Sequence, residues 1–305
     1  NNQRFSNKLR YWIPDEQSRN EFISIVRRLE GKHRHASTHA AGVVIGSDSV
    51  ANSMPMFITK GGERVSQYDM HGVAAIGLTK FDILGLRTLA VIDEACTFDG
   101  LNKDTIPIDD TNVFNMLRHG DTLGVFQCEG PSITQFIKDY RPDNMEDLAN
   151  INALYRPGPL DSGMAREYIS RRHGSDEWKS TINQVVYEIT SDTYGILVFQ
   201  EQVMQLAIKV ARFSLTQADT LRHAIGKKDV HTMKSLRSKF IDGAVKNGFS
   251  RKASIDLFSQ CETFARYGWN KAHSISYALI TYQTAYLKCN HPVAFYCSLL
   301  NHESD

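Results

Sequence analysis

An apolar run at residues 78–86 contains two charged residues, Lys80 and Asp82, within a segment that has the composition of a buried β-strand. Because side chains alternate along a strand, Lys80 and Asp82 share one face, while Phe81 and Ile83 share the other. Burial of an ionised carboxylate costs several kcal/mol unless a metal, a cation or hydrogen-bond donors meet it. We therefore expect Asp82 to be buried, either as a functional carboxylate or as a structural partner of Lys80 or of the next helix.

The residues around this strand predict a small α/β unit. Apolar residues between 22 and 29 have helical spacing and stop before Gly31, and residues 43–45 have the pattern of a short buried strand. Gly61 and Gly62 indicate a hairpin turn. Gly85 ends the apolar run, and apolar residues at 86, 89, 90 and 92 predict a helix directly after it.

Beyond Gly85 the pattern is mostly helical and is interrupted by Gly and Pro residues, which predicts a second, larger domain. Residues 200–213 predict an amphipathic helix with its apolar face in the core. Pro157 and Pro159 fix the backbone on either side of Gly158, so Arg156 stands on a stiff turn. That turn either presents Arg156 to a ligand or simply ends a helix.

Residues 214–228 predict a helix that begins at Ser214, stops at Gly226 and carries a cluster of cationic side chains near its end. These cations either bind phosphate groups or complement the helix dipole. The cluster consists of Arg222, His223, Lys227 and Lys228.

A loop rich in hydrogen-bond donors, residues 267–274, leads into a long helix that extends to residue 290. Free amides at the helix start, together with Asn270, Lys271 and His273, suit a phosphate. The aromatic side chains, Tyr267 among them, suit an attached sugar and base. The spacing alone leaves an ordinary structural helix start open as the alternative.

Composition narrows the class of protein. The chain has 305 residues, of which 42% are hydrophobic and 23% charged, as is typical of soluble proteins with two or three domains. Its 35 Lys and Arg residues nearly balance its 34 Asp and Glu residues, so any contact with nucleic acid depends on local clusters of bases. Five scattered cysteines indicate reduced thiols. No apolar run approaches the length of a membrane span.

Two further observations concern the first forty residues. The chain does not begin with Met, so we expect it to be a piece of a longer protein. His33, His35 and His39 invite a zinc site, but neither a cysteine nor an acidic residue lies among them. A basic loop beside the strand of Asp82 is the favoured interpretation, and a metal-dependent hydrolase is the disfavoured one.

Several motifs, in this order and over nearly the whole chain, resemble the alpha subunit of bacterial DNA polymerase III, a C-family replicative polymerase. They are His-Ala-Ser-Thr-His-Ala-Ala-Gly-Val-Val-Ile at 35–45, Lys-Phe-Asp-Ile-Leu-Gly-Leu-Arg at 80–87, Gly-Val-Phe-Gln at 124–127, Tyr-Arg-Pro-Gly-Pro at 155–159, Phe-Gln-Glu-Gln-Val-Met at 199–204, Leu-Arg at 221–222 with Gly-Lys-Lys at 226–228, and Tyr-Gly-Trp-Asn-Lys-Ala-His-Ser at 267–274.

The resemblance implies an α+β protein with a nucleotidyltransferase palm of the polymerase-beta type and a large, mostly helical fingers domain. Residues 1–32 would be the end of the thumb, 33–84 the second part of the palm, and 85–305 the fingers. Asp82 would be the third of the family's metal-binding carboxylates, with Lys80 as a basic neighbour, at a two-metal Mg²⁺ site. The first two carboxylates of the family lie in an Asp-x-Asp strand that no segment of this chain matches.

The resemblance also implies nucleotide-binding residues. Arg222, Lys227, Lys228 and Lys271 would neutralise triphosphate charge, and Tyr267 and His273 would face the base and sugar. Asn270 and Arg156 join this set. The chain departs from the family where His223 replaces an arginine, Trp269 replaces a phenylalanine and Gly130 replaces a serine.

The implied activity is template-directed DNA synthesis, a phosphoryl transfer from deoxynucleoside triphosphates to a primer 3′-hydroxyl. Implied partners are primer–template DNA and, for the full-length bacterial cytoplasmic protein, a sliding clamp, a proofreading exonuclease and clamp-loader subunits. The alternative is a nucleotide- or DNA-binding module without catalysis, which is how we expect this piece to behave alone.

Overall fold

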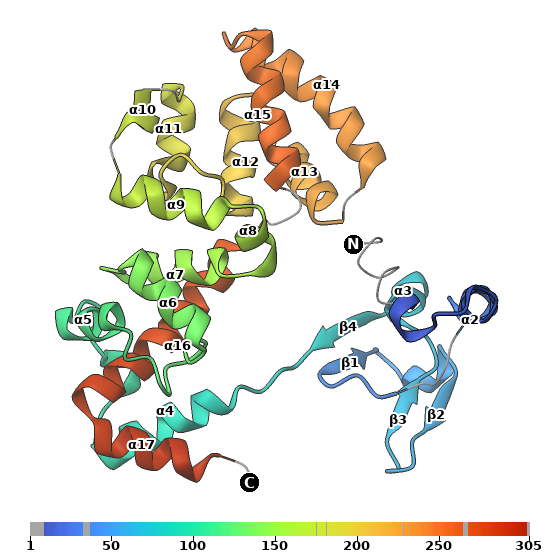
Figure 1. Ribbon diagram of the computed structural model, residues 1–305, viewed down its shortest axis with the longest axis horizontal. Helices are drawn as coiled ribbons and strands as arrows, with labels where there is room; N and C mark the ends of the chain where they lie inside the picture. Colours follow the sequence, from blue (N-terminus) through green and yellow to red (C-terminus); the bar gives the residue numbers. More distant parts are fainter. Residues whose placement is uncertain are drawn as a thin grey trace. The chain divides into compact units, whose positions relative to one another are not determined.

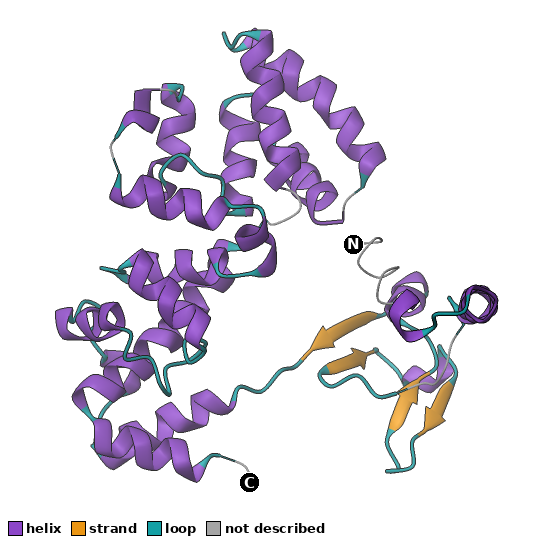
Figure 2. Cartoon of the chain, in the orientation of Figure 1, coloured by secondary structure: helices purple, strands orange, loops and turns teal. Residues whose placement is uncertain are grey.

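The structure is a computed structural model that describes residues 9–32, 37–174, 176–180, 182–227, 229–264 and 268–303, with the backbone alone at 227 and 230. The chain divides into two compact units, Asn1–Gly85 and Leu86–Asp305. Figure 1 traces both units along the sequence, and Figure 2 shows that the strands of the described residues lie in the first. An α+β protein with a largely helical second part was predicted, and this is confirmed.

The first unit contains two antiparallel sheets of two strands each, β1 with β4 and β2 with β3. The β2–β3 hairpin turns at Gly62, whose φ of 85° is a left-handed conformation that glycine adopts without strain. The elements are α2 (Glu16–Leu29), β1 (Gly42–Ile45), the 3-10 helix η1 (Val50–Asn52), β2 (Met56–Ile58), β3 (Arg64–Ser66), α3 (Met70–Ala75) and β4 (Thr79–Asp82).

The predicted burial of β1 and β4 is wrong. Val43 and Ile45 are 45% and 55% exposed, Phe81 is 47% exposed, and the Asp82 side chain is 59% exposed. The physical reason is that β1 is the one strand that pairs with β4 among the described residues, and a two-stranded sheet covers few of its own side chains. Asp82 is therefore an accessible carboxylate rather than a buried one.

The second unit is built from helices. Figure 1 shows α16 running through this unit, where it packs along α7 and contacts α4, α5 and α17. The elements are α4 (Arg87–Phe98), η2 (Lys103–Thr105), α5 (Thr111–His119), α6 (Pro131–Tyr140), α7 (Met145–Leu154), α8 (Pro157–Asp161), α9 (Met164–His173), α10 (Glu177–Ser180), α11 (Gln184–Thr190), η3 (Ser191–Thr193), α12 (Gln200–Lys209), α13 (Leu215–Lys227), α14 (Val230–Lys246), α15 (Arg251–Phe264), α16 (Lys271–Asn290) and α17 (Pro292–Asn301).

Two large apolar clusters form the core of this unit. The first gathers side chains from α5 to α9 and α16, including Phe114, Tyr168 and Tyr282. The second gathers side chains from α11 to α15, including Phe240 and Phe258. No helix in the part of the chain that the structure describes is both long enough and apolar enough to span a membrane.

A buried ion pair ties α7 to α9 within the first cluster. Arg172 donates to both carboxylate oxygens of Asp147 at 2.7 Å, and the two side chains are 8% and 5% exposed. The Tyr140 hydroxyl donates to the same carboxylate at 3.1 Å. Burial raises the pKa of Tyr140 above its ordinary value, so this hydroxyl stays a donor. The network fixes the helices that support α16.

Two predicted helix ends differ from the structure. The helix predicted for residues 200–213 ends at Lys209, although Val210 and Phe213 stay in the core. Gly226 does not stop the preceding helix, because α13 continues through it to Lys227. A glycine ends a helix where its left-handed conformation is used, and Gly226 is not among the glycines with positive φ.

Candidate functional site

Lys80 and Asp82 lie side by side on β4, as the alternation of the strand predicts. The Lys80 ammonium is 2.6 Å from Asp82 Oδ1, and β4 pairs with β1 so that Gly42 is opposite Asp82. A Cβ atom on Gly42 would lie 2.5 Å from Lys80 Cε. Gly42 therefore leaves room for the lysine to reach the carboxylate. The sequence analysis missed this role, although a glycine within a strand often marks such a close approach.

The hydrogen bond from Lys80 lowers the pKa of Asp82 below its ordinary value of 3.8. Because the folded-state pKa is depressed, the carboxylate is ionised at neutral pH, and the pairing is lost only as the pH falls through that pKa. We expect Lys80→Met to raise the pKa of Asp82 toward 3.8. A ¹³C NMR titration of the Asp82 carboxyl measures this, and an identical pKa in both proteins would contradict the pairing.

The part of the chain that the structure describes offers Asp82 no cluster of metal ligands. Among the described residues, no group of three or more His, Cys, Asp and Glu side chains is placed to hold a metal. His39 Nδ1 accepts hydrogen bonds from the backbone N–H groups of Ala41 and Gly42, at 3.1 and 2.7 Å. His33 and His35 lie outside the described residues. Asp82 is thus an exposed carboxylate that belongs to no such cluster among the described residues.

The start of α16 is already capped, so the prediction of free amides there is wrong. Asn270 Oδ1 accepts from the His273 N–H at 2.8 Å. Both oxygens of the Glu201 carboxylate accept from the Lys271 N–H at 3.1 Å, and Glu201 Oε1 also accepts from Asn270 Nδ2 at 3.0 Å. Acceptors from this chain therefore satisfy these amides, because Glu201 reaches them from α12.

Lys271 lies among carboxylates. It helps to line a pocket of about 280 Å³ whose other walls include Glu146, Glu188, Asp192 and Glu201. Its ammonium lies 5.7 Å from the centre of the Phe199 ring. The Lys271 side chain therefore shares this pocket with four acidic side chains.

Arg156 and His273, both predicted site residues, share another pocket of about 290 Å³. The Arg156 guanidinium lies 4.0 Å from the centre of the Trp269 ring, and its Nε donates to the Ala153 carbonyl at 2.8 Å. Burial lowers the pKa of Arg156. The His273 ring packs on Tyr277 with ring centres 4.1 Å apart. Tyr267, which belongs to the same motif, lies outside the described residues.

Arg222 lies on α13, whose core residues belong to the second apolar cluster. Its guanidinium pairs with Asp219 one turn earlier at 2.9 Å and contacts His223 Nε2 at 3.0 Å. Lys228 and the side chain of Lys227 lie outside what the structure describes. The structure thus groups Asn270, Lys271 and His273 at the start of α16, and it places Arg222 on a different helix.

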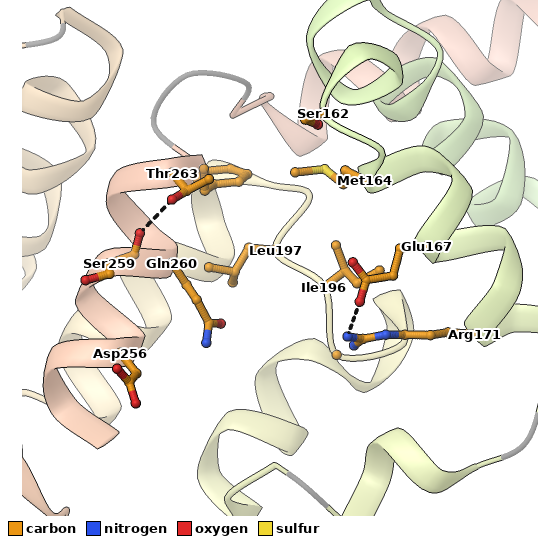
Figure 3. Close-up of a pocket in the computed structure, with 12 residues that line it drawn as sticks. Ser162, Met164, Glu167, Arg171, Ile196, Leu197, Asp256, Ser259, Gln260 and Thr263 are labelled. Atoms are coloured by element: carbon orange, nitrogen blue, oxygen red, sulfur yellow. Dashed lines mark hydrogen bonds and ion pairs between the residues drawn. The ribbon is translucent and has the colours of Figure 1, made fainter. Parts of the chain in front are cut away.

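A further pocket of about 590 Å³ was not predicted from the sequence. Figure 3 shows Glu167 and Arg171 of α9 on one side and Asp256, Gln260 and Thr263 of α15 on the other. None of the predicted site residues lines it. Its walls come from segments about ninety residues apart, and no local motif marks them.

Comparisons with known proteins match both units. The family model of the bacterial DNA polymerase III alpha NTPase domain matches residues 2–85, and that of the bacterial DNA polymerase III alpha subunit finger domain matches residues 87–248. The boundary between the models lies next to the division after Gly85.

The curated relatives that match this chain are also DNA polymerase III alpha subunits. The DNA polymerase III subunit alpha of Thermus aquaticus is 42% identical over 304 residues, which cover 95% of this chain and 25% of the relative. The corresponding protein of Deinococcus radiodurans is 43% identical, with 93% and 22% covered, and that of Campylobacter jejuni is 41% identical, with 98% and 26% covered. The chain spans about a quarter of the length of these relatives. Because the finger-domain model alone matches more than half of it, the chain belongs to the family of bacterial DNA polymerase III alpha subunits.

Proposed function

We propose that this chain forms part of a DNA-directed DNA polymerase that transfers deoxynucleotides to a primer 3′-hydroxyl under the direction of a template. The observation that carries the proposal is the pair on β4. Asp82 is exposed, is paired with Lys80 at 2.6 Å, which lowers its pKa, and lies in the segment matched by the NTPase-domain model. An accessible, ionised carboxylate is what a divalent metal at a phosphoryl-transfer site requires.

Residues 1–32 would form the end of the thumb, 33–84 the second part of the palm, and 85–305 the fingers. The division of the chain after Gly85 and the finger-domain match that begins at residue 87 support the last boundary. The mostly helical second unit suits fingers, and the strands that carry Lys80 and Asp82 suit a palm.

Mg²⁺ is the metal that this proposal assigns to Asp82, since hard carboxylate oxygens suit it. When bound, it would lower the pKa of the primer 3′-hydroxyl and offset triphosphate charge. Asp82 would supply one carboxylate ligand, and Lys80 would hold Oδ1 and keep the group ionised. The remaining ligands would come from carboxylates outside this chain.

The fingers would bind the incoming nucleotide. Arg222, Lys227, Lys228 and Lys271 would contact its phosphates, where charge builds up on the leaving pyrophosphate. Tyr267 and His273 would face its base and sugar, and Asn270 and Arg156 would also bind the nucleotide. Primer–template DNA, deoxynucleoside triphosphates, a sliding clamp, a proofreading exonuclease and a clamp loader would be the partners of the complete bacterial enzyme, in the cytoplasm.

A binding module without catalysis is the second candidate, because among the described residues no group of three or more His, Cys, Asp and Glu side chains is placed to hold a metal. We expect the complete polymerase to extend a primer with Mg²⁺ and four deoxynucleotides, and the isolated chain 1–305 to bind nucleotides or DNA without extending the primer. Gel analysis of both proteins on one labelled primer–template tests this. No extension by the complete protein would refute the proposed function.

A further inference from the structure

Glu201 contacts the start of α16, and the proposed function gives this contact no role. Its carboxylate lies in the first turn of α12 and accepts hydrogen bonds from the Lys271 N–H and from Asn270 Nδ2, at 3.0 to 3.1 Å. Seventy residues separate Glu201 from Lys271 in the sequence. One carboxylate therefore serves the N-terminal ends of two helices, where negative charge is favourable.

Several hydrogen bonds hold the start of α12, which carries Glu201. The Gln202 side chain, 8% exposed, accepts from the backbone N–H groups of Val198 and Phe199 at 2.8 and 3.0 Å. It also donates to Thr193 Oγ1 at 2.8 Å. In addition, the Gln200 N–H donates to the Trp269 carbonyl at 2.8 Å. Glu201 thus reaches the start of α16 from a helix end whose position these hydrogen bonds fix.

On the α16 side of the contact, the structure fixes the orientation of two predicted nucleotide-binding side chains, Asn270 and His273. Asn270 uses Oδ1 to cap the His273 N–H and Nδ2 to reach Glu201, so both ends of its amide are engaged. The His273 ring is then set between Trp269 and Tyr277, with ring centres 5.0 and 4.1 Å away. Loss of the Glu201 carboxylate would free the amide of Asn270 and the first turn of α16 together.

We propose that Glu201 is a positioning residue that fixes the start of α16 for nucleotide binding, through its hydrogen bonds to Asn270 and Lys271. This inference rests on the proposed polymerase function. It assigns Glu201 no contact with the nucleotide itself. Glu201 affects nucleotide binding because it fixes the positions of these residues. Removal of its carboxylate therefore weakens nucleotide binding, even though it also removes a negative charge near Lys271.

The opposite outcome follows if Glu201 acts only as a charge. Four carboxylates line the pocket that contains Lys271, and they would repel a triphosphate. Removal of any one of them would then lower the KM for deoxynucleotides. Glu188 offers a matched control, because it lines the same pocket and is exposed, and no described residue hydrogen-bonds to it.

Steady-state incorporation of one deoxynucleotide by the complete polymerase tests the proposal. We expect Glu201→Ala to raise the KM for the nucleotide about tenfold, with kcat and melting temperature little changed, because loss of positioning weakens binding of the nucleotide. Glu201→Gln keeps an acceptor of the same length and should stay within about twofold of the wild type. Glu188→Ala should leave the KM unchanged.

An unchanged or lower KM in Glu201→Ala would overturn the proposal, and so would an equal increase in Glu188→Ala. If Glu201→Ala does not fold, Glu201→Asp replaces it, since a carboxylate shorter by one methylene cannot reach α16 in the same geometry. An unchanged KM in that variant also overturns the proposal. Failure of the wild-type enzyme to incorporate nucleotide would count against the proposed function instead.

Discussion

Asp82→Asn in the complete polymerase is expected to reduce DNA synthesis on the order of a thousandfold while leaving DNA affinity and melting temperature close to those of the wild type. The substitution keeps the size of the side chain and removes the charge that a divalent metal needs. DNA affinity should survive because it depends on many dispersed contacts between cations and phosphates. Stability should survive because the Asp82 side chain is 59% exposed and its pairing with Lys80 is screened by solvent.

The competing interpretation of Asp82 makes the opposite prediction. If Asp82 is only the structural partner of Lys80, the same substitution leaves synthesis in place. Single-nucleotide incorporation, DNA binding and thermal unfolding should therefore be measured on one preparation of the variant. Asp48→Asn, which alters an exposed carboxylate in the same unit, is the matched control and should behave like the wild type.

Arg172→Met is expected to lower the free energy of unfolding by about 3–5 kcal/mol, because it leaves the Asp147 carboxylate buried without its counter-charge. The pair is bidentate, at 2.7 Å for both bonds, and both side chains are less than one-tenth exposed. Arg172 also donates to the Tyr194 hydroxyl at 3.0 Å, so its removal also breaks a contact with the residue that ends η3.

Denaturant unfolding of the wild type and the variant measures this effect. Arg166→Met is a suitable control, because Arg166 is exposed on the same helix α9, and we expect a change within about 0.5 kcal/mol. If Arg172→Met changed the free energy of unfolding as little as Arg166→Met does, the buried pair would not support the helices around α16.

The start of α16 shows how much of the candidate site could be predicted from the sequence. The sequence predicts a loop at residues 267–274 that leads into a long helix, and in the structure α16 already begins inside this segment, at Lys271, with Asn270 as its cap. Helical spacing, however, says nothing about what meets the free amides. Glu201 meets them from a helix seventy residues earlier, and only the tertiary packing of α12 against α16 brings it there.

Strand β4 shows a second limit of prediction from the sequence. The alternation of side chains correctly placed Lys80 beside Asp82, because it follows from local backbone geometry. Burial depends instead on how many strands and layers cover a sheet, and a strand in a two-stranded sheet leaves Phe81 half exposed. Gly42, which makes room for Lys80, became visible only through the register of β1 and β4.

The central claim, that Asp82 is a metal-binding carboxylate of a polymerase, is tested most directly by changing the ligand and the metal together. Single-turnover incorporation by Asp82→Cys in the complete enzyme should be compared in Mg²⁺ and in Mn²⁺, since a thiolate is a poor ligand for the harder Mg²⁺. We predict almost no incorporation with Mg²⁺ and partial recovery with Mn²⁺. Incorporation at the wild-type rate with Mg²⁺ would contradict the claim.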